Sequence, residues 1–154
     1  MSDLEDFLKV RDKSHFSTEP YARKTEKPWG WELHFVPDEM PYMGKILHID
    51  EGRRVSLQLH DKKQESWLLL RGNVSISVEL PDGSMQDIKL SSEYGYTIGV
   101  GQKHRLVGGT GGGDVLEVST PEIGTTYRLE DDYNRPDETI ELRQQRNENL
   151  TDTR

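Results

Sequence analysis

Apolar and polar residues alternate one by one through the middle of this 154-residue chain, and this period constrains the fold more than any other feature. From Val74 to Leu80 the aliphatic residues fall at every second position, with serine or glutamate between them. A period of two places alternate side chains on opposite faces of a β-strand, so this segment is predicted to be a half-buried strand. No stretch inside 28–135 has convincing helical periodicity.

Turn-forming residues separate further short apolar runs at intervals of about 8–12 residues. The runs are 46–49, 55–60, 65–70, 88–90, 96–98, 105–107 and 115–119. The turn signals are 51–52, 71–73, 81–83, 94–95 and the glycine-rich run 108–113. This spacing predicts an all-β sandwich or barrel. The glycine-rich run is predicted to be a flexible hairpin loop, because the Lys-Ser or Lys-Thr of a phosphate loop does not follow it.

Both ends of the chain are polar, which predicts one domain with two extensions. Residues 1–26 form the N-terminal extension, in which Ser2 and Glu5 fit the capping box of a short helix. The domain is expected to cover 27–136. Residues 137–154 are expected to form a polar, disordered tail, because few apolar groups follow Leu142 to offset the entropy of ordering it.

Charge and composition exclude several classes of function. A formal net charge of −8 argues against a nucleic-acid partner, which needs a basic surface. The absence of cysteine excludes disulfides, thiolate zinc sites and cysteine nucleophiles. No apolar run approaches the roughly 20 residues of a membrane span, and the N-terminus lacks the apolar core of a signal peptide. We therefore expect a cytoplasmic protein that binds neither membranes nor nucleic acid.

Four polar side chains have the spacing of a candidate metal site. Gln58 and His60 share one face of a predicted strand, and Glu65 can approach His60 if the next strand pairs with it as a hairpin. His104 is the fourth candidate. This mixed set of nitrogen and oxygen donors suits zinc, iron, manganese, cobalt or nickel. The alternative interpretation is that both histidines are half-buried residues with ordinary hydrogen-bond partners.

The same residues resemble the sequence motifs of the cupin superfamily. The first motif is matched in its spacing by Gly52, Gln58-Leu59-His60, Glu65 and Gly72, with Gln58 in place of the usual first histidine. Residues 99–106, which include His104, resemble the second motif more loosely, with Gly99 in place of its proline. The resemblance implies a jelly-roll barrel (a double-stranded β-helix) with a metal held by Gln58, His60, Glu65 and His104.

Three segments narrow the resemblance to the cupin domain of type II mannose-6-phosphate isomerases, which in bacteria is often fused to a mannose-1-phosphate guanylyltransferase. They are Lys27–Glu32, then Ser56–His60 with Glu65 and Trp67, and Tyr127–Arg135. The resemblance implies a metal-dependent aldose–ketose isomerase that acts on a sugar phosphate. It also implies one divalent ion, with zinc as first choice and manganese, iron, cobalt or nickel as alternatives. A homodimer is expected.

The chain departs from that family between the second and third ligands. Asp61, Lys62 and Lys63 stand where the family has a histidine-rich stretch and an arginine, and an ammonium does not replace a guanidinium conservatively. An isomerase needs a base for the C2 proton, and the candidates are Lys103, Lys63 or a hydroxide on the metal. Lys63 or Arg105 is the candidate for binding the phosphate.

Two other functions stay open. The altered stretch before Glu65 favours a non-catalytic cupin that binds a sugar or a nucleotide sugar. An iron-dependent dioxygenase is disfavoured by Gln58, which is a weak ligand for tuning iron. Elsewhere, Arg128 and Arg135 are predicted to pair with the acidic residues at 130–132, and Trp29 and Trp31 to pack in the core or in a subunit interface.

Overall fold

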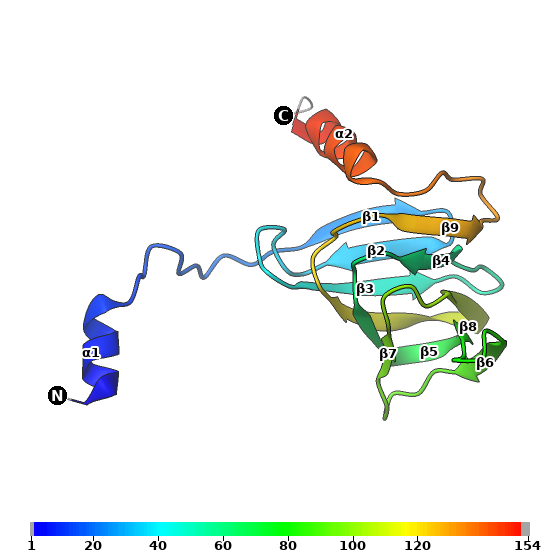
Figure 1. Cartoon of the computed structure of the whole chain (residues 1–154), viewed down its shortest axis with the longest axis horizontal. Coiled ribbons are helices and arrows are strands. Elements are labelled where there is room, and N and C mark those ends of the chain that lie inside the picture. The colour runs from blue at the N-terminus through cyan, green and yellow to red at the C-terminus, as the bar shows by residue number, and fades with distance from the viewer. Residues whose placement is uncertain (1, 152–154) are drawn as a thin grey trace.

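A curled antiparallel sheet forms the body of the protein in the computed structural model, which describes residues 2–151 and only the backbone of 148–151 (Figure 1). The all-β class predicted from the sequence is confirmed. The strands are β1 (Arg23–Lys27), β2 (Gly30–His34), β3 (Met43–Ile49), β4 (Leu57–His60), β5 (Glu65–Glu79), β6 (Met85–Lys89), β7 (Tyr96–Ile98), β8 (His104–Ser119) and β9 (Thr126–Glu130). Helix α1 (Asp3–Val10) stands apart from the sheet, and α2 (Ile140–Thr151) lies beyond β9.

The strand order explains how distant residues meet inside the curl. One path of neighbours runs β1-β2-β3-β8-β4-β9, while β5 pairs with β6, β7 and β8. The predicted hairpin of β4 with β5 does not form, because β4 pairs with β9 and, at Gln58, with β8. Glu65 approaches His60 across the inside of the curled sheet instead.

Two glycine-rich segments that were predicted to be turns lie inside long strands. β5 continues through residues 71–73 and β8 through 108–113, and the two strands pair along most of their length with register shifts near Gly72. Gly72 has a φ of 81°, and a Cβ there would lie within 3.0 Å of the Gly112 carbonyl. These glycines therefore permit bulges and close backbone approach, and the prediction of a loop at 108–113 was wrong.

The inner face of the sheet carries an apolar core at one end. Val74, Ile76 and Val78 are buried and alternate with half-exposed serines, as the period of two predicted. Trp29 is also buried in this core. Trp31 lies instead on the outer face, where it stacks on His48 with ring centroids 5.2 Å apart.

Both extensions contain a helix. The predicted capping box is present in α1, because the Ser2 hydroxyl accepts from Glu5 N and the Glu5 carboxylate accepts from Ser2 N. Where a disordered tail was expected, α2 forms from residues with high helix propensity. Arg143 ties it to the backbone carbonyls of Gly124 and Glu138. The expectation for 152–154 lies outside the described residues. Neither described helix is long and apolar enough to cross a membrane.

Candidate metal centre

Three side chains from three strands meet inside the curl of the sheet. The Oε1 atom of Glu65 lies 3.1 Å from Nε2 of His60 and 2.8 Å from Nε2 of His104. Their ligand atoms all lie within 4.8 Å of one another, and the three residues are buried. The structure thus brings together three of the four side chains that the sequence suggested as metal ligands.

The hydrogen bonds of the two imidazoles leave their inner nitrogens available to a cation. Nδ1 of His104 donates to the Gln102 carbonyl at 2.7 Å, so Nε2 carries a lone pair. That nitrogen is buried and has no hydrogen-bond partner among the described residues, although a carboxylate oxygen faces it. Thr126 Oγ1 lies 2.8 Å from Nδ1 of His60 and can accept its proton, which leaves Nε2 of that ring facing Glu65 Oε1 at 3.1 Å. Two nitrogens and a carboxylate oxygen oriented like this fit a divalent metal ion.

Gln58 lies next to this cluster. It is the register partner of His104 on the neighbouring strand, and its side chain lines the same cavity as His60 and Glu65. Its Oε1 accepts a hydrogen bond from the Ser56 hydroxyl at 2.8 Å. The amide oxygen is therefore held on the inner face, where it can serve as a fourth ligand.

The second oxygen of Glu65 faces a buried lysine. Nζ of Lys63 lies 3.1 Å from Oε2 of Glu65 and 3.1 Å from Oε2 of Glu117. Burial opposes the charge of Glu65, but Lys63 and the imidazoles outweigh it and hold the pKa of Glu65 well below its ordinary value. Burial likewise opposes the charge of Lys63, yet the surrounding carboxylates raise its pKa well above the ordinary range. Lys63 is thus held as an ammonium, a form that orients carboxylates and does not accept a proton.

Sequence reasoning missed a second layer of charge in the same cavity. Nζ of Lys45 lies 3.1 Å from Glu122, 3.6 Å from Glu117 and 3.8 Å from Glu32. The indole N–H of Trp67 donates to Glu117 at 3.0 Å. Burial raises the pKa of Glu117 above its ordinary value, against the effect of the two lysines. The signal was present in the alternation, since Lys45 and Glu117 occupy inward positions of otherwise apolar strands.

These groups line a cavity of about 840 Å³. Its lining includes the candidate ligands Gln58, His60 and Glu65 and the charged residues Lys45, Lys63 and Glu117. Residues of β1 and of α2 also line it. The cavity has room for a small polar molecule beside the candidate metal ligands.

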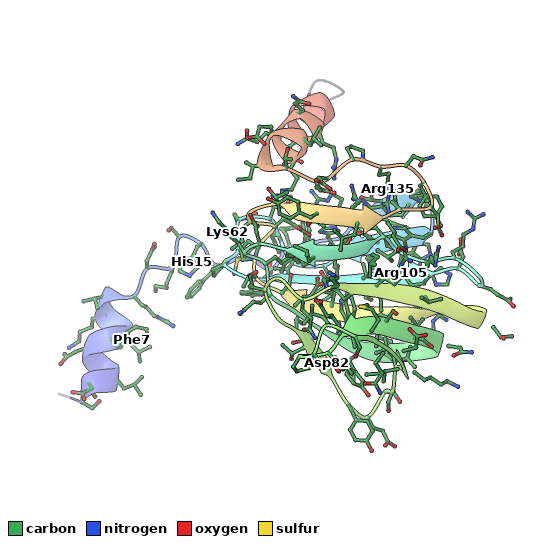
Figure 2. The ribbon with its side chains drawn as sticks, turned by 45° about the vertical axis from the view of Figure 1, so that its right-hand side comes forward. Phe7, His15, Lys62, Asp82, Arg105 and Arg135 are labelled. Atoms are coloured by element: carbon green, nitrogen blue, oxygen red, sulfur yellow. The ribbon has the colours of Figure 1, made fainter. Side chains whose placement is uncertain are left out.

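The structure does not bring the other two catalytic candidates to this cluster. Lys103 is partly exposed and lies 3.7 Å from Glu79. Arg105 on β8 donates to the Val55 carbonyl at 3.0 Å and to Glu130 at 3.2 Å (Figure 2). Neither residue lines the cavity, so only Lys63 of the three candidates lies inside it.

Arg128 in β9 and Arg135 beyond it both form ion pairs, but only Arg135 has a partner that the sequence suggested. Arg135, in the segment between β9 and α2, pairs with Asp131 at 2.8 Å (Figure 2). Arg128 pairs with Glu138 at 3.0 Å and not with the acidic residues at 130–132. Both arginines line the cavity, a position that the sequence did not predict.

Comparisons with known proteins agree with this architecture. Among solved structures, the E162A mutant of Bacillus subtilis oxalate decarboxylase OxdC superposes with a TM-score of 0.63 at 13% identity, over 77% of this chain and 34% of that chain. A second structure of Bacillus subtilis oxalate decarboxylase, from work on its Mn(II) centres, gives a TM-score of 0.61 at 13% identity, over 81% of this chain and 36% of that chain. The capsular polysaccharide assembling protein CapF from Staphylococcus aureus gives 0.54 at 14% identity, over 84% and 34%. These likenesses show a shared cupin fold, and the chain spans about a third of the length of those structures.

Comparison of the sequence itself gives a more specific result. No curated protein matches the chain. The family model described as mannose-6-phosphate isomerase C-terminal matches residues 14–143, which is most of the chain. The protein therefore belongs to the mannose-6-phosphate isomerase C-terminal family of cupin domains.

Proposed function

We propose that this protein is a metal-dependent isomerase that interconverts the aldose and ketose forms of a sugar phosphate such as mannose 6-phosphate. The observation that carries the proposal is the convergence of two imidazole nitrogens on Glu65 Oε1 beside a cavity of about 840 Å³ that is lined by His60 and Glu65. Membership of the isomerase C-terminal family supports it.

The proposed ligands are His60, Glu65 and His104, with Gln58 as the fourth. Zinc and manganese both accept such a set of ligands, and the structurally similar oxalate decarboxylase has Mn(II) centres. In a site of this kind a divalent ion supplies Lewis acidity toward the carbonyl and hydroxyl oxygens of the opened sugar. Thr126 and the Gln102 carbonyl fix the two rings so that their Nε2 atoms face inward.

Glu117 is the proposed base. Its carboxylate lies in the cavity wall, its Oε1 accepts from the Trp67 indole, and burial raises its pKa toward the range of a useful base. It takes the proton from C2 and returns it to C1, while the hydroxyl proton passes from O2 to O1, and the aldose becomes the ketose. Lys63, 3.1 Å from Glu117, stabilises the negative charge that develops beside it.

A homodimer and a cytoplasmic location complete the proposal. On the outer face of the sheet, Leu57 and Leu59 of β4 neighbour Tyr127 and Leu129 of β9, and the two β9 residues are exposed. An apolar row of this kind suits contact with a second copy. Light scattering on the purified chain measures the mass directly.

The alternative is a non-catalytic cupin that binds a sugar or a nucleotide sugar. The position of Glu117 between two ammonium groups favours it, because Lys45 and Lys63 oppose protonation of this carboxylate. Ligand binding without turnover is its signature.

The test is an assay of mannose 6-phosphate conversion by nuclear magnetic resonance, with chelator-stripped and metal-loaded protein. The proposal predicts turnover that is lost on stripping and restored by a divalent ion. Glu117→Gln should lower kcat at least about 100-fold with unchanged metal content. Metal-loaded protein that converts no hexose or pentose phosphate would contradict the proposal. Thermal stabilisation by such ligands without turnover would favour the alternative.

A further inference from the structure

A second, smaller cavity of about 390 Å³ adjoins the main one beside β9. The two cavities share Lys27, Arg128, Arg135, Glu138 and Arg146 in their walls. Four cationic side chains line the smaller cavity, against the two carboxylates of Asp137 and Glu138. Arg135 and Lys27 have further carboxylate partners in Asp131 and Glu32, whereas Arg128 and Arg146 share the one carboxylate of Glu138. Two guanidiniums that share a single carboxylate favour an anion beside them.

Arg128 connects this smaller cavity to the candidate metal centre. It faces Gln58 in the β4–β9 ladder, and it shares the inner face of β9 with Thr126, which contacts His60. Two residues along a strand span about 7 Å, so the Cα atom of Arg128 lies about that distance from the Cα atom of Thr126, the residue that contacts His60. The guanidinium extends from there into the wall of both cavities.

The guanidinium of Arg128 retains an unused donor. One terminal nitrogen donates to the Pro136 carbonyl and the other to Glu138 at 3.0 Å. The Nε atom is buried and has no hydrogen-bond partner within the described chain. Leaving a buried donor unpaired is unfavourable, so this N–H is available to an acceptor that enters the cavity.

We propose that the smaller cavity binds the phosphate group of the substrate, with Arg128 as the main donor and Lys27 and Arg146 as supporting cations. The sugar part of this inference rests on the proposed function. A guanidinium suits phosphate oxygens in both charge and geometry. Glu138 accepts from Arg128 and from Arg146, so its carboxylate competes with the phosphate for the same donors.

The two residues that the sequence offered for the phosphate are less suitable. Arg105 lies outside the cavity walls and is bonded to Val55 and Glu130. Lys63 lies inside, but three carboxylates stand within 3.3 Å of its ammonium, and they would repel a dianion.

Calorimetric titration of the metal-loaded chain with mannitol phosphate tests the site, since this ligand has no carbonyl to isomerise. Mannitol serves as the uncharged probe and inorganic phosphate as the free anion. Arg128→Gln should weaken mannitol phosphate binding at least about 10-fold and leave mannitol binding unchanged. Inorganic phosphate should bind more weakly than mannitol phosphate, with the same dependence on Arg128. Arg54→Gln is the matched control, because Arg54 forms an exposed pair with Asp132 and lines neither cavity.

Glu138→Gln separates an anion site from a purely structural ion pair. The proposal predicts tighter binding of mannitol phosphate, by about 3- to 10-fold, because the competing carboxylate is gone. A structural pair predicts that both variants weaken binding together, and that result would overturn the proposal, as would wild-type affinity in Arg128→Gln. If Arg128→Gln does not fold, Arg128→Lys keeps the charge and should bind with intermediate affinity. Wild-type affinity in Arg128→Lys would also contradict the claim that the Arg128 guanidinium is the main donor to the phosphate.

The same measurements distinguish this inference from the isomerase proposal. Binding of mannitol phosphate that depends on Arg128, without turnover of any sugar phosphate, would reject the isomerase and keep the anion site. Turnover of mannose 6-phosphate with an unchanged KM in Arg128→Gln would keep the isomerase and reject the anion site.

Discussion

The ammonium of Lys63 lies 3.1 Å from Oε2 of Glu65, while Oε1 of the same carboxylate lies 2.8 Å from Nε2 of His104. One carboxylate therefore joins the candidate metal position to the charged layer formed by Lys45, Lys63, Glu117 and Glu122. Its buried members Lys45, Lys63 and Glu117 depend on their neighbours to remain charged.

Removal of the Lys63 ammonium should destabilise the fold. In Lys63→Met, Glu65 loses a buried ammonium partner and Glu117 keeps Lys45 as its one remaining ammonium, so the free energy of unfolding should fall by about 3–5 kcal/mol. Urea unfolding measures the change. Lys62→Met is the matched control, because Lys62 is the exposed neighbour. Equal stability of the two variants would show that the buried pairs contribute nothing.

Changes at Gln58 should alter metal affinity in opposite directions. Gln58→Ala removes an oxygen donor and should weaken the binding of zinc by about 10-fold, whereas Gln58→His supplies a stronger imidazole ligand and should tighten it. Competition with a chelating dye measures both affinities. Gln64→Ala, at an exposed position in the loop between β4 and β5, should bind as the wild type does. Unchanged affinity in all three variants would remove Gln58 from the ligand set.

The acid sensitivity of the fold should depend in part on Glu32. Burial opposes its charge, but Lys45, His34 and Lys27 outweigh that effect and lower the pKa of Glu32 far below its ordinary value of 4.5. Below pH 4.5 the unfolded chain therefore binds more protons at this residue than the folded chain, and the free energy of unfolding falls as the pH falls.

Glu32→Gln should therefore lower stability at pH 7 and flatten the acid side of the stability curve, by up to about 1.4 kcal/mol per pH unit. Urea unfolding at several pH values from about pH 3 to about pH 7 gives this stability curve. Glu39→Gln, at an exposed position, is the control. Parallel curves for wild type and Glu32→Gln would be inconsistent with a depressed pKa.

The close approach of β5 and β8 gives a test of the fold itself. At Gly72 an added Cβ meets the Gly112 carbonyl and the backbone has a positive φ, so Gly72→Ala should cost at least about 2 kcal/mol of stability. Gly83 has a similar φ, but no atom lies within 4 Å of its added Cβ. Gly83→Ala should therefore cost only about 1 kcal/mol, the conformational part alone. Similar losses in both variants would argue against the steric contact.

Local rules predicted the features that depend on neighbouring residues in the chain. The alternation predicted that Val74, Ile76 and Val78 of β5 are buried, and the spacing of Ser2 and Glu5 predicted the cap of α1. The resemblance to cupin motifs predicted that His60, Glu65 and His104 lie close together, as they do in the structure. Motif spacing carries information about tertiary contacts that the period of a strand does not.

Strand pairing and charge partners could not be predicted in the same way. Gly72 and the run 108–113 were predicted to be turns. A glycine with a positive φ occurs in bulges as well as in turns, and only pairing with the facing strand distinguishes the two. Arg128 was assigned to nearby acidic residues, but its partner is Glu138, which the return of the chain beside β9 brings close. Lys45 and Glu117 find their partners across the sheet, at separations that no local pattern records.

Metal uptake by the whole chain tests the central claim most directly. Chelator-stripped protein is dialysed against zinc or manganese, and its metal content is measured by elemental analysis. The account predicts one ion per chain for the wild type and for His48→Ala, whose ring lies on the outer face against Trp31. The double variant His60→Ala/His104→Ala should take up none. A wild type that binds no ion, or a double variant that binds as much as the wild type, would contradict the account.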